Sequence, residues 1–118
     1  MTARRLLAAA LALTTIPPRR DRRGRERRVV AFNRRVLESG RLYEVPVWNY
    51  WRAFERRRMV HSGIGPDGIH PNLYGGCAPP LGCRAYDFTR RGLRYGYNQR
   101  NLGALRLLER VRAALGAT

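Results

Sequence analysis

Apolar residues recur at helical spacing in two long stretches of the chain. Residues 27–39 predict an amphipathic helix, because apolar side chains share one face and Gly40 follows as a C-terminal stop. Residues 98–115 predict the clearest helix, with a leucine stripe opposite a charged face. The stripe consists of Leu102, Leu105, Leu108 and Leu115. Residues 2–10, rich in Ala and Leu, also favour helix.

Two shorter apolar runs have the character of strands. Residues 11–16 predict a short buried strand that Pro17 and Pro18 terminate. Residues 43–48 predict a second strand, and Pro46 indicates a position near a sheet edge or an irregular point.

The second strand is followed by a short helix and a long segment without clear periodicity. Asn49 is suited to cap a helix over residues 50–57. Residues 59–97 are rich in Gly, Pro and Asn, which predicts a long loop, and their aromatic residues favour an ordered one. A loop of this length inside a compact domain is typical of a functional region, so we expect the active-site loop here.

The order helix, strand, helix, strand, helix, loop, helix is the alternation of an α/β fold with a parallel sheet. Two strands are few for such a sheet, which needs several strands with helices on both faces. We therefore expect residues 1–118 to form a single partial domain whose N-terminal half precedes Met1.

The chain is strongly basic, with a formal net charge of +16. Such a charge is typical of proteins that bind nucleic acid or another polyanion, and a small Arg-rich binding protein is one interpretation. All 24 basic residues are Arg, however, which favours a genome-wide codon bias. The arginines are spread along the chain and are not interleaved with aromatics on one element, so we expect no nucleic-acid partner.

The cysteines and the N-terminus leave the cellular compartment open. Cys77 and Cys83 can form a disulfide if the chain is exported, or remain two loop thiols. Their spacing does not suit zinc, and we expect no metal or cofactor. The apolar run at residues 6–13 after Arg4 and Arg5 is typical of a signal peptide, but an internal strand fits it better. No segment is long enough to span a membrane. The cysteine pair weakly favours an exported protein.

The candidate chemistry lies in Asp67-Gly68-Ile69-His70-Pro71. A carboxylate beside an imidazole holds it in one tautomer and stabilises the imidazolium that forms when it accepts a proton. Alone, the same residues also form ordinary surface turns. Asp67 and His70 are thus the candidate catalytic residues, as the base half of a hydrolase site.

Several segments, taken in order, resemble the C-terminal portion of the SGNH (GDSL-type) hydrolases, which are esterases and lipases. The resemblance implies an incomplete sheet of a flavodoxin-like three-layer α/β/α fold, with His70 as general base and Asp67 orienting it. The substrate would be a small acyl or carbohydrate ester. The matching segments are Thr14-Thr15-Ile16-Pro17-Pro18-Arg19, Ala31-Phe32-Asn33, Val45-Pro46-Val47-Trp48-Asn49-Tyr50-Trp51, the Asp67 to Pro71 block, and the stretch from Leu93 to Leu102.

The family's serine and oxyanion blocks have no counterpart in this chain. The only serines are Ser39 and Ser62, and neither has the family's surroundings, so neither is a predicted nucleophile. We therefore expect the chain to supply only the Asp-His half of an esterase site and to be inactive on ester substrates by itself.

Overall fold

The computed structural model describes residues 12–59, 62–74 and 84–116. The expected helix at residues 2–10, His61, and the cysteines Cys77 and Cys83 lie outside these ranges. In chain order the elements are β1 (Leu13–Thr14), α2 (Arg25–Leu42), β2 (Val47–Trp48), α3 (Tyr50–Arg56), the 3₁₀ turn η1 (Gly92–Arg94) and α4 (Gly96–Ala114).

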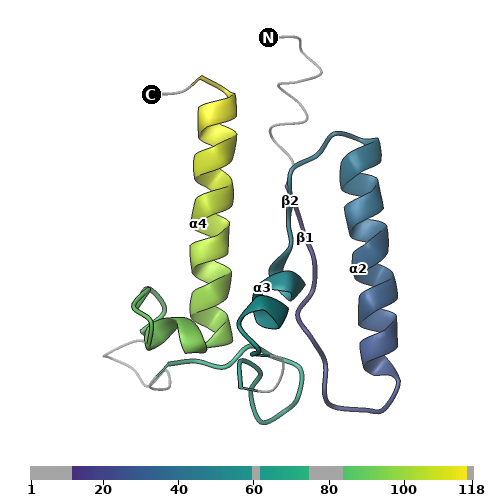
Figure 1. Ribbon diagram of the computed structural model, residues 1–118, viewed down its shortest axis with the longest axis vertical. Helices are drawn as coiled ribbons and strands as arrows, with labels where there is room; N and C mark the ends of the chain where they lie inside the picture. Colours follow the sequence, from purple (N-terminus) through teal and green to yellow (C-terminus); the bar gives the residue numbers. More distant parts are fainter. Residues whose placement is uncertain (1–11, 60–61, 75–83, 117–118) are drawn as a thin grey trace.

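The two strands form a parallel sheet that lies between α2 on one side and α4 on the other (Figure 1). Leu13 pairs with Val47, and Thr14 pairs with Trp48. The described part of the chain is therefore a small, mainly helical α/β unit, which confirms the predicted order of strands and helices from the first strand onward and the parallel pairing.

Both strands are shorter than the predicted residues 11–16 and 43–48. The second begins late because Glu44 has a left-handed φ of 53°, which a strand does not accommodate. The first ends early because Ile16 pairs with a side chain instead of a strand. Asn33 of α2 accepts the Ile16 N–H through Oδ1 at 2.8 Å and donates Nδ2 to the Ile16 carbonyl at 2.9 Å.

Helix α2 extends beyond the predicted residues 27–39, and Gly40 lies inside it. A Cβ at residue 40 would meet the Val47 side chain, so this glycine allows the helix to approach β2 closely. The helix ends in a Schellman motif, in which Val45 N–H donates to the Gly40 carbonyl at 2.9 Å and Glu44 N–H to the Arg41 carbonyl at 3.4 Å. The prediction that Gly40 stops the helix was wrong, because packing against β2 determined its position.

Helix α3 agrees with its prediction at both ends. The Asn49 side chain accepts the Arg52 N–H at 3.1 Å, which is an N-cap. At the other end, Met59 N–H donates to the Phe54 carbonyl at 2.8 Å, and Arg58 adopts a left-handed φ of 52°. This second Schellman motif turns Met59 back against Phe54.

The core lies where α3 meets the following loop and β2. Phe54 is fully buried and packs edge-on against Tyr50 at 5.0 Å between ring centroids. Met59 and Ile64 complete this cluster, and Trp48 packs against it. The core therefore connects the sheet directly to the loop that carries the candidate site.

Helix α4 begins at Gly96, two residues before the predicted start. Gly96, Asn98 and Gln99 of its first turn are buried. The fully buried Asn98 donates Nδ2 to the carbonyls of Asp87 and Gly92, both at 3.1 Å. Farther along, Leu105 and Leu108 are 54% and 63% exposed, so the predicted leucine stripe is only partly covered.

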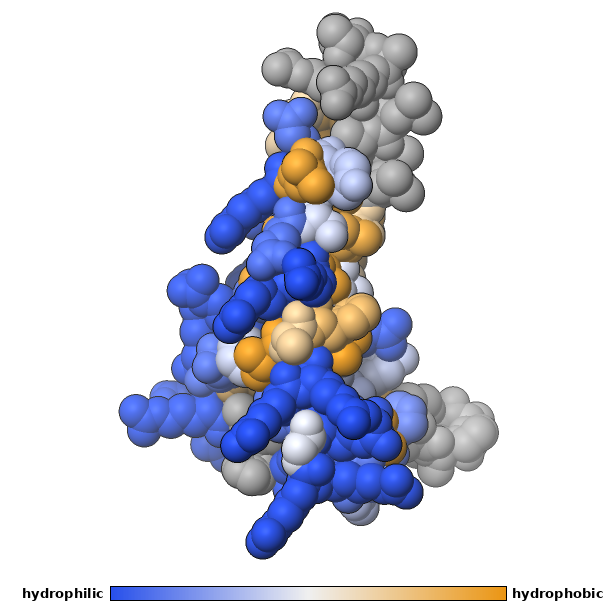
Figure 2. All heavy atoms as spheres, turned by 90° about the vertical axis from the view of Figure 1, so that its right-hand side faces the viewer, coloured by the Kyte–Doolittle hydropathy of each residue, from blue (hydrophilic) through white to orange (hydrophobic). Residues whose placement is uncertain are grey.

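The face of the molecule that α2 forms is largely hydrophilic, with apolar side chains between the charged ones (Figure 2). Phe32 and Leu42 on this helix are exposed. Within the described ranges, no helix is both long enough and apolar enough to cross a membrane.

Candidate active site

Asp67 and His70 lie at the tip of a hydrogen-bonded loop. Gly65 N–H donates to the His70 carbonyl at 2.7 Å, and Asn72 N–H donates to the Gly63 carbonyl at 3.0 Å. Ile64 and Pro71 form an antiparallel bridge between these two bonds. Because Ile64 also belongs to the core, the tip is held rigidly relative to the sheet.

The carboxylate of Asp67 fixes both the loop and the imidazole of His70. Its Oδ2 lies 2.5 Å from His70 Nδ1. Its Oδ1 accepts the backbone N–H groups of Ile69 at 2.9 Å and His70 at 3.0 Å. An ionised carboxylate can only accept, so Nδ1 carries the proton and Nε2 is the ring nitrogen not engaged with Asp67.

These hydrogen bonds hold the pKa of Asp67 well below its usual range. The largest cause is the bond from the His70 side chain, followed by the N–H groups of Ile69 and His70. Asp67 is therefore a carboxylate throughout the neutral range and can compensate a positive charge on the imidazole. The side chains of His70 and Asp67 are 79% and 48% exposed, so the pair contributes little to folding stability.

Gly68 docks the loop on the segment that follows β1. Its φ of 74° lies in the left-handed region, and an added Cβ would be 2.8 Å from the Asp21 nitrogen. Arg20 N–H donates to the Gly68 carbonyl at 2.7 Å, and Arg20 Nη2 reaches the Ile64 carbonyl at 3.4 Å. The glycine between Asp67 and His70 thus allows both the turn and its attachment.

Asn72 holds the other end of the loop and was missed by the sequence analysis. Its Oδ1 accepts the Gly96 N–H at 2.8 Å, and its Nδ2 donates to the Ser62 carbonyl at 2.6 Å. Its carbonyl accepts the Tyr97 N–H at 3.1 Å. Asn72 therefore attaches the loop that carries His70 to the start of α4. No local pattern signals this role, because its partner Gly96 is distant in sequence.

His70 borders a hollow of about 630 Å³ whose walls are mainly apolar. The hollow runs from the end of β1 across β2 and the start of α3 to α4. An apolar cavity beside an oriented imidazole suits a substrate with an apolar portion. Its lining residues are Thr14, Thr15, Ile16, Pro17, Arg19, Trp48, Tyr50, Ile69, His70, Pro71, Leu73, Tyr97 and Arg100.

Two of the hydroxyl groups that line this hollow, those of Thr15 and Tyr50, have structural partners. Thr15 donates to Asn49 Oδ1 at 3.2 Å and accepts the Trp51 N–H at 2.9 Å. The Tyr50 hydroxyl donates to the Gly96 carbonyl at 2.7 Å, and burial raises its pKa. Neither serine of the sequence lines the hollow.

The described residues include no group of three or more His, Cys, Asp or Glu side chains that could share a metal ion. Comparisons of the chain with protein-family models, with curated proteins and with solved structures found no match.

Proposed function

We propose that Asp67 and His70 are the general-base half of a serine ester hydrolase site of the SGNH type. The observation that carries this proposal is the hydrogen bond from His70 Nδ1 to Asp67 Oδ2 at the rim of an apolar hollow. The serine and the oxyanion donors come from a polypeptide segment outside the described residues.

In this reaction Nε2 of His70 removes the proton from the serine hydroxyl while the serine oxygen attacks the ester carbonyl. Asp67 stabilises the resulting imidazolium through its Oδ2. The imidazolium then protonates the leaving alkoxide, which departs as the alcohol, and an acyl-enzyme remains. Water repeats the sequence with the same base and releases the acid.

The arrangement of strands and helices supports the proposal that this α/β unit is part of a flavodoxin-like three-layer fold. The parallel strands lie between α2 and α4, and His70 follows the second strand. Among the described residues β1 pairs only with β2, so its other edge is available to a further parallel strand. A strand there would lie next to the hollow that His70 borders.

The test is hydrolysis of p-nitrophenyl butyrate by residues 1–118 alone and by residues 1–118 extended with any in-frame coding sequence found upstream of Met1. We expect turnover only from the extended protein. His70→Ala in that protein lowers kcat/KM by about 10³-fold or more, and Asp67→Asn lowers it by about 10²-fold or more.

His61→Gln is the matched control, since it removes the other histidine of the sequence and is expected to leave turnover unchanged. Turnover by the extended protein that is independent of His70 contradicts the assignment of the base. Turnover by the original chain that depends on His70 contradicts the division of the site into two halves.

A further inference from the structure

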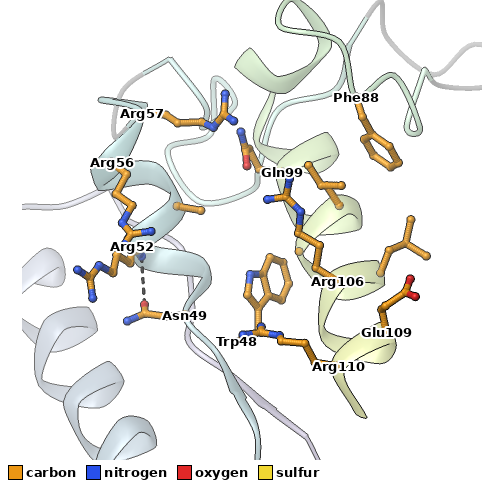
Figure 3. A pocket seen from close by; sticks show the side chains of 14 residues that line it. Trp48, Asn49, Arg52, Arg56, Arg57, Phe88, Gln99, Arg106, Glu109 and Arg110 are labelled. Atoms are coloured by element: carbon orange, nitrogen blue, oxygen red, sulfur yellow. Dashed lines mark hydrogen bonds between the residues drawn. The ribbon is translucent and has the colours of Figure 1, made fainter. Parts of the chain in front are cut away.

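A second groove, of about 1040 Å³, lies between α3 and α4 and is bordered by five arginines. Arg52, Arg56 and Arg57 come from α3 and its C-cap, and Arg106 and Arg110 come from α4. Figure 3 shows the two sets on opposite sides of the groove, with Trp48 between them. His70 does not line this groove, which shares one lining residue, Trp48, with the hollow beside His70.

The five guanidinium groups have no acidic partner within the described ranges. None lies within 4.0 Å of a carboxylate there, and all five residues are exposed. Glu109 is the one acidic residue that lines the groove, and it already pairs with Arg112 at 3.0 Å. The groove therefore presents uncompensated positive charge to solvent.

The spacing of the arginines repeats on both helices. Arg52 and Arg56 are four residues apart on α3, as are Arg106 and Arg110 on α4, so each pair lies on one helix face, one turn or about 6 Å apart. Like charges at this spacing destabilise a helix by a few tenths of a kcal/mol per pair. A multivalent anion between the two rows would remove this repulsion.

Apolar residues form the wall between the basic rims. The indole of Trp48 lies against Gly103 of α4, where an added Cβ would overlap its ring. Phe88, Leu102 and Leu105 line the same groove. An aromatic and apolar wall between rows of arginine suits a ligand that combines a flat ring with phosphates.

We propose that this groove binds nucleotide phosphates, with at least two phosphates between the two rows of arginine. The sequence analysis expected no nucleic-acid partner, because arginines and aromatics do not alternate on one element. The fold brings them together from β2, α3 and α4. The inference stands independently of the proposed hydrolase.

The test compares two triple variants that remove the same charge. Arg52→Gln/Arg56→Gln/Arg106→Gln alters the groove, and Arg27→Gln/Arg34→Gln/Arg41→Gln alters exposed arginines of α2 that do not line it. Fluorescence anisotropy measures the binding of a labelled ten-nucleotide single-stranded DNA and of a labelled ATP analogue. Circular dichroism verifies that the variants fold, and the single changes Arg56→Gln and Arg106→Gln replace the triple variant if it does not.

We expect the groove variant to weaken binding about tenfold or more and the α2 variant to weaken it less than about threefold. For the oligonucleotide, the groove variant also reduces the magnitude of the slope of log K against log salt by about 2, because three phosphate contacts are lost. If the ATP analogue binds and the groove variant weakens its binding, the ligand of the groove is a free nucleotide. If only the oligonucleotide binds in this way, the ligand is a single-stranded nucleic acid. Equal losses in the two variants, or no saturable binding of either probe, overturn the proposal.

Discussion

Replacing Asn72 with alanine removes the two side-chain hydrogen bonds that attach the His70 loop to the start of α4 and to Ser62. Each bond contributes about 1 kcal/mol net, and the Gly96 N–H, which belongs to a buried residue, loses its partner at a further cost. We expect Asn72→Ala to lower the free energy of unfolding by about 2–3 kcal/mol. Urea denaturation followed by circular dichroism at pH 7 measures this loss.

Asn72→Asp is the matched control for this prediction. It keeps an oxygen acceptor for the Gly96 N–H, where a negative charge is favourable at the helix N-terminus, but it replaces the donor to the Ser62 carbonyl with a carboxylate oxygen that repels this carbonyl. Because the buried Gly96 N–H keeps its partner, we expect a smaller loss than in Asn72→Ala. The reasoning is refuted if Asn72→Ala changes stability by less than about 0.5 kcal/mol, or if the two variants are equally destabilised.

Three further predictions concern local features. Arg58→Gly relieves the left-handed φ of 52° and should stabilise the protein by about 0.5–1 kcal/mol, seen as a higher Tm; an unchanged or lower Tm argues against strain there. Gly103→Ala should destabilise the protein and shift its tryptophan fluorescence, because the added methyl group displaces the Trp48 indole. This effect should outweigh the helix preference of alanine over glycine, which is about 1 kcal/mol. A stabilised variant with unchanged emission contradicts this contact. Asp67 has a lowered pKa, so its ionised form stabilises the fold above the unfolded-state pKa of about 4, and this contribution disappears as pH falls through the folded pKa. Because the pair is largely exposed, the stability difference between wild type and Asp67→Asn is small at neutral pH, and it should shrink further below about pH 4 in urea titrations. A difference that stays constant with pH contradicts this prediction.

The parts of the fold that the sequence predicted are those that depend on neighbouring residues. The Asn49 side chain caps the start of α3 by accepting the backbone N–H of Arg52, which is only three residues away in sequence. The parallel α/β order likewise follows from alternating apolar runs. By contrast, Gly40 has the usual character of a helix stop, yet it lies within α2 because Val47, from another element, occupies the space beside it. The left-handed conformation of Glu44, in the motif that follows the end of that helix at Leu42, has no local signal, since glycine is the residue expected there.

The candidate site likewise has one part that local sequence predicts and one part that it does not. Asp67 and His70 are three residues apart, so their contact could be predicted from the sequence alone. Asn72 depends on Gly96, and the groove arginines depend on the approach of α3 to α4, so neither could be read from spacing. Their positions are consequences of tertiary packing.

The protonation site of the His70 imidazole tests the central claim most directly. Nitrogen-15 chemical shifts of the ring nitrogens, followed through a pH titration in a His61→Gln background, identify which nitrogen carries the proton in the neutral ring. The Asp67–His70 contact predicts a proton on Nδ1 that is lost from this position in Asp67→Asn. The same mixture of tautomers in both proteins would contradict the claim that Asp67 orients His70 as a base.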